Sequence, residues 1–244
     1  MSEDYSLARD FHENTKAPPL SRNYDPKPNY KIYPSAIALP IAKTDVHNDK
    51  DDGFIQTLLN RKSIREFSQE NIGFEDLGRL LSLSFGFRHD NGNPPLRTYA
   101  SAGARYPIEV YVAVLRSDDM EKGVYHFNVK DNSLELVKRG EFSDKLNSFY
   151  KNQDEVIPTG YPCLVLFSMV FNRTMQKYGE RGYRFMLMDA GHMGQNLYLV
   201  ATHLNLGVVA LGAGSDNDDR IDNIIGLESS EENVFYSFAL GVPQ

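Results

Sequence analysis

The sequence predicts an α+β fold, because its strands and helices do not follow the regular strand–helix–strand order of a parallel sheet. Residues 123–128 and 134–138 flank a Lys-Asp-Asn turn, which is typical of a β-hairpin. The wholly apolar run 163–170 predicts a separate buried strand. Residues 182–205 repeat apolar or small side chains every three or four positions and predict one long buried helix.

The first 50 residues are expected to form an N-terminal helix and an extended arm ahead of one main domain, residues 51–244. Residues 3–14 can form a short helix, and residues 17–40 hold six of the twelve prolines. Such a segment cannot donate regular backbone hydrogen bonds, so we expect it to run extended. Its composition is that of a surface segment, and we expect it to wrap a second copy of the chain.

The main domain contains further elements on either side of the hairpin. Apolar side chains at helical spacing in residues 54–59 predict a helix that ends near Arg61. The β-branched run 108–115 predicts a strand. The remaining expected elements are helices at 74–87, 142–151 and 217–226, and strands at 207–212 and 234–240.

Composition limits the classes of protein that the chain can represent. It carries a formal net charge of −7, and no broad basic region opposes it, which disfavours a nucleic-acid partner. It has no apolar run long enough to span a membrane and no signal peptide at its start. Its one cysteine, Cys163, lies inside an apolar run, so we expect an inert buried thiol and a cytoplasmic location.

The most informative segment is the basic cluster Arg61-Lys62-Ser63-Ile64-Arg65. Guanidinium groups bind phosphate oxygens in pairs, and the serine hydroxyl adds a donor, so the cluster suits a small anionic ligand. The alternative is a solvated helix terminus, because cations also favour the C-terminal end of a helix.

Two segments rich in small residues adjoin predicted strands. Residues 101–107 read Ser-Ala-Gly-Ala-Arg-Tyr-Pro, which would let the backbone approach a bulky group or would simply form a tight loop. The strand at 207–212 leads into Gly212-Ala213-Gly214. A dinucleotide-binding fold is excluded there, because Asn217 occupies the third glycine position and only 30 residues follow Gly214.

Residues 176–185 place Lys177, Tyr178, Arg181 and Arg184 just before the long helix. They can be a polar helix start with ordinary salt bridges. They can also supply an acid–base pair, since a nearby cation lowers the pKa of a phenol or an ammonium group. The six histidines show no ligand spacing; Asp189 and His192 lie three apart with no third ligand, so no metal site is expected.

Several of these segments together resemble the FMN-dependent nitroreductase superfamily. More narrowly, they resemble its SagB-type branch, the azoline oxidases of thiazole- and oxazole-modified peptide biosynthesis. The likeness spans roughly residues 54–242 and rests on RKSIREF (61–67), SAGARYPIEVYV (101–112), GVYHF (123–127), KYGERGYRFMLMDAGHMGQNLYL (177–199) and LNLGVVALGAG (204–214). It implies a central, mostly antiparallel sheet flanked by helices, in an intertwined homodimer with FMN at the interface.

The resemblance also implies roles for individual residues. Arg61 and Ser63, with Lys62 beside them, would hold the phosphate or ribityl chain of FMN, and Arg65 would face the flavin ring. Backbone N–H groups near Ala213 and Gly214, after Gly212, would reach flavin N5. The partner subunit would pack four further residues on the ring, namely Ser101, Ala102, Gly103 and Ala104.

Lys177 and Tyr178 match the Lys-Tyr pair of the azoline oxidases, which the resemblance implies takes a proton while hydride leaves the substrate. The family's basic C-terminal phosphate clamp has no counterpart at Gly241-Val242-Pro243-Gln244, so Arg184 is our candidate for the second cation. A cyclodehydratase partner would deliver a peptide substrate. Two other functions stay open: a general NAD(P)H-dependent nitro- or quinone reductase, and a non-catalytic flavin-binding subunit.

Overall fold

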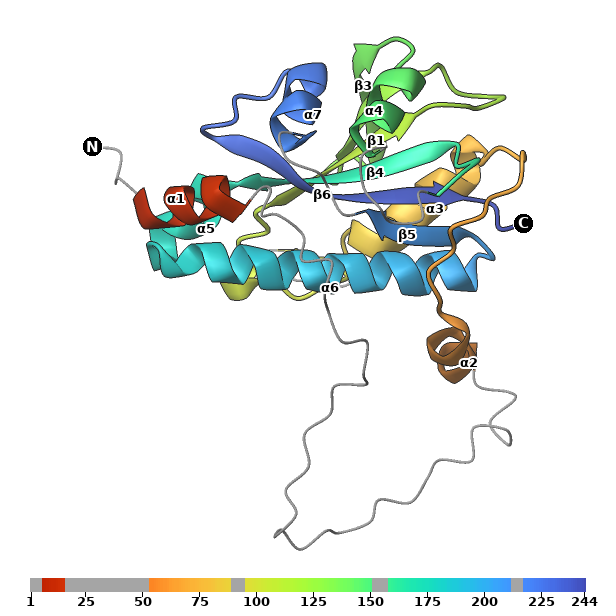
Figure 1. Cartoon of the computed structure of the whole chain (residues 1–244). Coiled ribbons are helices and arrows are strands. Elements are labelled where there is room, and N and C mark those ends of the chain that lie inside the picture. The colour runs from red at the N-terminus through yellow and green to blue at the C-terminus, as the bar shows by residue number, and fades with distance from the viewer. Residues whose placement is uncertain (1–5, 16–52, 89–94, 151–157, 212–216) are drawn as a thin grey trace, which may run out of the picture.

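A six-stranded antiparallel sheet forms the centre of the molecule (Figure 1). The computed structural model describes residues 6–15, 53–88, 95–150, 158–211 and 217–244. The strand order is β3-β2-β1-β4-β6-β5, and each neighbouring pair is antiparallel. The strands are β1 (Ile108–Val114), β2 (Gly123–Asn128), β3 (Ser133–Arg139), β4 (Cys163–Val170), β5 (Gly207–Leu211) and β6 (Glu232–Gly241).

Helices cover both faces of this sheet, which makes two hydrophobic cores. The long helix α6 and α3 pack on one face, and α4 and α7 pack on the other (Figure 1). The helices are α1 (Ser6–Thr15), α2 (Gly53–Asn60), α3 (Phe74–Phe85), α4 (Ser143–Tyr150), α5 (Phe171–Tyr178), α6 (Arg181–His203) and α7 (Asn217–Ile225), with a short 3₁₀ helix η1 (Ala102–Ala104).

Strand β4 is apolar except for Ser168 because it lies between the two cores, and Ser168 is buried with its hydroxyl donating to Glu232. Val165 and Phe167 point into the core under α6, while Leu164 and Leu166 point into the core under α7. Successive side chains of a strand face opposite sides of the sheet, so a strand covered on both sides has no solvent-facing position for a polar residue. Cys163 is 2 % exposed, and burial raises the pKa of its thiol to about 12, as its apolar sequence context predicts.

The predicted α+β fold is confirmed, and one helix is an addition to it. The segment around Lys177 is not only the polar start of the long helix, because a separate helix, α5, runs from Phe171 to Tyr178. Gly179 ends α5 with a φ of +55°, in the left-handed region that glycine adopts readily. The chain therefore turns sharply between α5 and α6, and Lys177 and Tyr178 stand at that turn.

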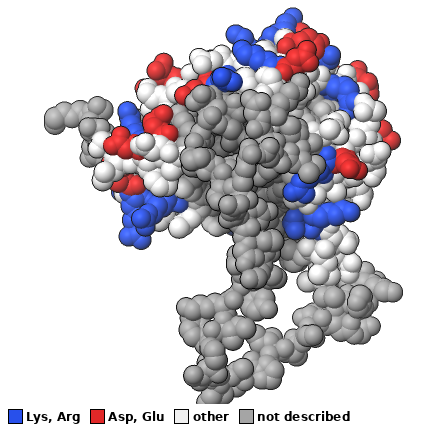
Figure 2. Space-filling model, in the orientation of Figure 1, with Lys and Arg blue, Asp and Glu red and all other residues white. Residues whose placement is uncertain are grey.

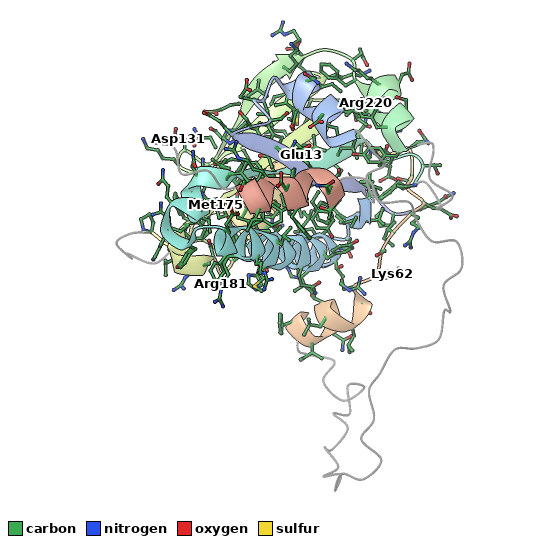
Figure 3. The ribbon with its side chains drawn as sticks, turned by 60° about the vertical axis from the view of Figure 1, so that its left-hand side comes forward. Glu13, Lys62, Asp131, Met175, Arg181 and Arg220 are labelled. Atoms are coloured by element: carbon green, nitrogen blue, oxygen red, sulfur yellow. The ribbon has the colours of Figure 1, made fainter. Side chains whose placement is uncertain are left out.

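The N-terminal helix α1 is tied to the same turn (Figure 3). The Glu180 carboxylate accepts hydrogen bonds from the backbone N–H groups of Leu7 (3.1 Å) and Ala8 (2.7 Å). His12 is 5 % exposed and bonds through its two ring nitrogens to the Tyr183 hydroxyl (2.9 Å) and to Asn233 Oδ1 (2.7 Å). The predicted arm lies outside the described residues, and the division near residue 50 stays a prediction.

Charged side chains of both signs are interspersed among the described residues on the face that Figure 2 shows. Among the described residues, no helix combines the length and the apolar character that crossing a membrane requires.

Gly207 allows the segment after α2 to lie directly on β5. A Cβ atom at this glycine would stand 2.8 Å from Ile64 Cγ2 and 2.9 Å from Ile64 Cβ. The Ile64 N–H donates to the Val208 carbonyl at 3.1 Å, so this close approach fixes the position of the basic cluster.

We expect Gly207→Ala to lower the free energy of unfolding by about 1–3 kcal/mol, because the new methyl group forces Ile64 away from β5. Urea denaturation followed by circular dichroism would measure this change. The matched control is Gly78→Ala in α3, where a Cβ meets nothing within 4 Å, and it should stabilise the protein by about 1 kcal/mol. Equal effects of the two substitutions would contradict the packing argument.

Candidate functional site

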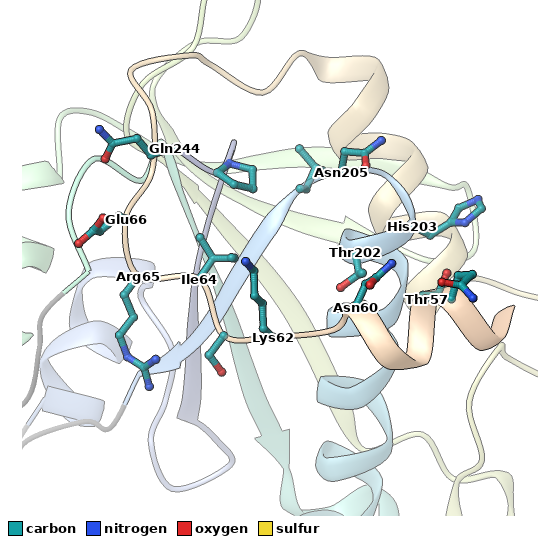
Figure 4. Close-up of a pocket in the computed structure, with 14 residues that line it drawn as sticks. Thr57, Asn60, Lys62, Ile64, Arg65, Glu66, Thr202, His203, Asn205 and Gln244 are labelled. Carbon is teal, nitrogen blue, oxygen red and sulfur yellow. The ribbon is translucent and has the colours of Figure 1, made fainter. Parts of the chain in front are cut away.

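The basic cluster forms an extended segment between α2 and the body of the protein. Backbone hydrogen bonds hold it at Ile64 and at Arg65, whose carbonyl accepts from the Thr159 N–H at 3.2 Å. Because successive side chains of an extended chain alternate, neighbouring residues of the cluster face opposite sides. Figure 4 shows this alternation: Lys62 and Ile64 point one way and Arg65 points the other.

Arg61 and Ser63 contact the same residue of α6, Tyr198. The Arg61 guanidinium lies over the Tyr198 ring at 5.6 Å, and Ser63 Oγ is 3.4 Å from the Tyr198 hydroxyl. The Ala210 N–H of β5 donates to that hydroxyl at 2.7 Å. Tyr198 therefore links the basic cluster to the sheet. The sequence did not indicate this role, because Tyr198 stands within the apolar pattern of the long helix.

Lys62, Ser63 and Arg65 all line a cavity of about 690 Å³, which the C-terminal end of α6 also lines, and the Lys62 side chain leaves the segment on the side opposite to Arg65 (Figure 4). The structure thus brings together Arg61, Ser63 and the Tyr198 hydroxyl, and it directs Lys62 away from Arg65. Of the five residues in the cluster, those at odd positions form the better anion-binding set.

The small-residue segment folds as η1 and is fastened to α6 by a buried carboxylate. The Ser101 hydroxyl donates to Asp189 Oδ2 at 2.5 Å, and the Ala102 N–H donates to Oδ1 at 3.2 Å. Ser101 Oγ in turn accepts from the Tyr106 N–H at 2.9 Å. Asp189 is 2 % exposed, and burial raises the pKa of its carboxyl although both hydrogen bonds oppose that shift.

Two more residues on the same side of α6 secure the chain before η1. His192 Nδ1 lies 3.0 Å from the Ala100 carbonyl, and Asn196 Nδ2 donates to the Thr98 carbonyl at 3.3 Å. With Asp189 they occupy positions i, i+3 and i+7, which share one helical face. Asp189 and His192 therefore position the loop before η1. The described residues contain no cluster of three or more His, Cys, Asp or Glu side chains that could hold a metal ion.

The candidate acid–base pair converges on Gly103. Lys177 Nζ lies 5.2 Å from the centre of the Tyr178 ring, and the Tyr178 ring packs edge-on against Phe185. A Cβ atom at Gly103 would stand 2.8 Å from Lys177 Nζ and would collide with the Tyr178 hydroxyl. Gly103 has a φ of +61°, so both its conformation and its missing side chain leave room for this pair.

The basic cluster and the acid–base pair lie toward opposite ends of α6 within one chain. Figure 3 shows Lys62 beside α2 and Arg181 at the start of α6, far apart along the molecule. Tyr198 follows Asp189 by nine positions, or about 13 Å along the helix, and Arg184 stands about 21 Å from Tyr198 by the same measure. Arg184 is exposed, and within one chain it lies too far from Arg61 to bind the same phosphate. Residues 212–214 lie outside the described residues.

The groups present suit a flavin phosphate and ring. Among the described residues, no carboxylate forms an ion pair with Arg61 or Arg65. Within the same residues the Ser63 hydroxyl makes only the long 3.4 Å contact, so it can bind a ligand. The Gly103 loop offers a surface without bulky side chains.

We expect Asp189→Ala to lower the free energy of unfolding by about 1–3 kcal/mol, because it leaves the Ser101 hydroxyl and the Ala102 N–H without their acceptor. Asp76→Ala on the exposed side of α3 is the matched control and should cost about 0.5 kcal/mol. Urea denaturation would compare them, and an equal loss in both variants would refute the role of Asp189.

Comparison with known proteins finds similar chains. A curated protein of Methanocaldococcus jannaschii, described as a nitroreductase, is 33% identical over 163 residues, which cover 67% of this chain and 80% of that protein. The microcin B17-processing protein McbC of Escherichia coli is 27% identical over 221 residues, which cover 84% of this chain and 78% of McbC.

Solved structures share the fold. A chain of the E. coli microcin synthetase McbBCD complex, solved with truncated pro-MccB17 bound, superposes with a TM-score of 0.77 at 22% identity; the match covers 98% of this chain and 93% of that chain. The sequence model of the nitroreductase family matches residues 58–242, a range that includes the basic cluster, η1 and both α5 and α6. The chain therefore belongs to the nitroreductase family.

Proposed function

We propose that the chain is an FMN-dependent oxidoreductase of the SagB type that oxidises azoline rings in a modified peptide. The observation that carries this proposal is the convergence of Lys177 and Tyr178 on the small loop at Gly103. A general flavin reductase needs no such pair beside its flavin, whereas removal of a ring proton does. The similarity to McbC, a microcin-processing protein, supports a peptide substrate.

Arg61 and Ser63 would bind the phosphate end of FMN, and Arg65 would face the pyrimidine side of the ring. A fixed cation there stabilises the negative charge of reduced flavin. Ser101 to Ala104 of a second subunit would cover the ring, Gly212, Ala213 and Gly214 would approach N5, and Arg184 would supply a further cation. When bound, FMN supplies the acceptor for hydride.

Exposed apolar surface supports a homodimer. Helix α2 has no buried residue, and its Phe54 and Leu59 are 63 % and 52 % exposed. On α6, Met188 is 58 % exposed next to Leu187. Apolar surface of this kind on regular helices is typical of a subunit interface. A second copy would also bring the Gly103 loop of one chain to the basic cluster of the other.

Oxidation of an azoline requires the loss of one proton and one hydride from adjacent carbons. The neutral amine of Lys177 or the phenolate oxygen of Tyr178 would receive the α-proton, hydride would pass from the β-carbon to the acceptor that bound FMN supplies, and the ring would gain a double bond. Lys177 Nζ lies 5.2 Å from the centre of the Tyr178 ring, and both polar groups adjoin Gly103, so a substrate at this loop would meet both. A cyclodehydratase partner would form the azoline that this reaction consumes.

The alternative is a general NAD(P)H-dependent nitro- or quinone reductase, which the similarity to the M. jannaschii protein favours. It would use the same flavin-binding residues. Rapid bleaching of the flavin by NADPH, with nitroaromatic turnover and without azoline oxidation, would support that alternative and exclude the SagB-type function.

We expect Lys177→Ala and Tyr178→Phe each to lower the turnover of a thiazoline peptide by about 10²- to 10⁴-fold, because each removes a proton-transfer group. Mass spectrometry would follow the loss of two hydrogens from the peptide, and the flavin absorbance should stay unchanged. Gln176→Ala is the control on the exposed surface of α5. Unchanged turnover in both test variants would exclude the proposed mechanism.

We expect Arg65→Ala to weaken FMN binding by about 10- to 100-fold, because a charge-assisted hydrogen bond is lost. Lys62→Ala should have a smaller effect, since Lys62 points to the other side of the segment (Figure 4). Quenching of FMN fluorescence on titration with apoprotein would measure both constants. A larger effect at Lys62 would reverse the assignment of the two sides.

A further inference from the structure

A cleft of about 380 Å³ opens where the start of β1 meets the β2–β3 turn and helix α5. Four cations line it, whereas the chain as a whole is acidic. They come from four separate segments of the chain and are Arg97, Arg105, Lys130 and Arg173. Neither the flavin-binding residues nor the acid–base pair account for this cleft.

The three arginines are fixed in place by contacts around Tyr106. The Arg97 guanidinium stacks on the Tyr106 ring at 4.7 Å, and its Nη1 donates to the Tyr99 hydroxyl at 3.0 Å. Arg173 Nη1 donates to the Tyr106 carbonyl at 3.1 Å, and Arg105 Nε donates to the Arg173 carbonyl at 2.6 Å. A ligand would therefore meet cations whose conformations are already restricted, so binding would cost little side-chain entropy.

Among the described residues that line the cleft, Glu109 is the one carboxylate, and it does not balance all four cations. Glu109 forms an ion pair with Arg173 and lies 2.9 Å from His126 Nε2. Burial would raise the pKa of Glu109, but the hydrogen bond from His126 and the charge of Arg173 hold it below its ordinary value. Glu109 thus balances one cation, and Arg97, Arg105 and Lys130 remain.

Arg97 also has a donor without an acceptor. Its Nε atom is buried and makes no hydrogen bond among the described residues. A buried donor without a partner is costly, so the position of Arg97 at the cleft is not explained by its contacts within the described residues alone.

The cleft adjoins the candidate acid–base pair. Arg173 precedes Lys177 by four positions on α5, so the two side chains share one face of the helix, with Cβ atoms about 6 Å apart. Gly103 lies against Lys177 and Tyr178, and Arg105 comes two positions after it. A peptide whose ring contacts Lys177 would place its next residues over these arginines.

We propose that this cleft binds an acidic side chain of the peptide substrate that flanks the ring being oxidised, and so selects among peptides. The inference rests on the proposed function for its substrate, a peptide. The planar guanidinium groups of Arg97 and Arg105 match the two oxygens of a carboxylate, and Lys130 adds a cation at the rim.

The test is direct binding to the FMN-loaded protein, which does not depend on turnover. The probe is a short fluorescein-labelled Gly/Ser peptide with two adjacent glutamates, and its counterpart carries glutamines; both have an amidated C-terminus. Fluorescence anisotropy would measure the dissociation constant of the glutamate peptide. We expect this constant to be at least about tenfold higher for Arg105→Glu and for Lys130→Glu than for the unaltered protein. Arg79→Glu, on the exposed side of α3, makes the same charge change outside the cleft and should leave binding unaltered.

Equal affinity for the glutamate and glutamine peptides would overturn the inference, and so would an equal loss of affinity in Arg79→Glu and Arg105→Glu. Displacement of the labelled peptide by adenosine 2′,5′-bisphosphate but not by the unlabelled glutamate peptide would also overturn it, because it would assign the cleft to a nucleotide phosphate. If the peptide binds as expected but no azoline is oxidised, the proposed function fails and the cleft remains a peptide site. If azoline turnover is intact and the variants bind the probe normally, only the cleft assignment fails.

Discussion

The buried carboxylate of Asp189 is the contact on which the candidate site depends. It accepts the hydrogen bonds that hold the Gly103 loop on α6, and Lys177 and Tyr178 can meet at this loop only because Gly103 leaves them room. A carboxylate that is 2 % exposed is stable only when donors surround it. The loop and the carboxylate therefore require each other, and the acid–base pair depends on both.

Much of the fold could be predicted from the sequence because its signals are local. The apolar run of β4 and the apolar spacing of α6 were found within one or two residues of their bounds. Helix α5 was missed as a separate element, because its break from α6 depends on the conformation of a single residue, Gly179. Such a break carries no signal in hydrophobic periodicity.

The candidate site was predictable only in part. Arg61, Ser63 and Lys177 stand in short segments whose residue types indicate their chemistry. Tyr198 and Asp189 could not be assigned in the same way, because Ser63 and Ser101, which they contact, lie more than 80 residues away along the chain. The orientation of Lys62 away from Arg65 follows from the extended backbone of the cluster, which the pattern of charges alone did not reveal.

The docking of α1 joins the two ends of the chain and orders their assembly. His12 contacts Asn233 Oδ1 of β6, 221 residues later in the chain. The nitrogen of the same Asn233 side chain donates to the buried Asp222 carboxylate at 2.5 Å. A ribosome releases α1 long before it releases β6, so α1 has no complete docking surface until β6 has been synthesised. Since Glu180 bonds to α1 beside Tyr178, the turn that carries the acid–base pair acquires its final contacts only after β6 has been made.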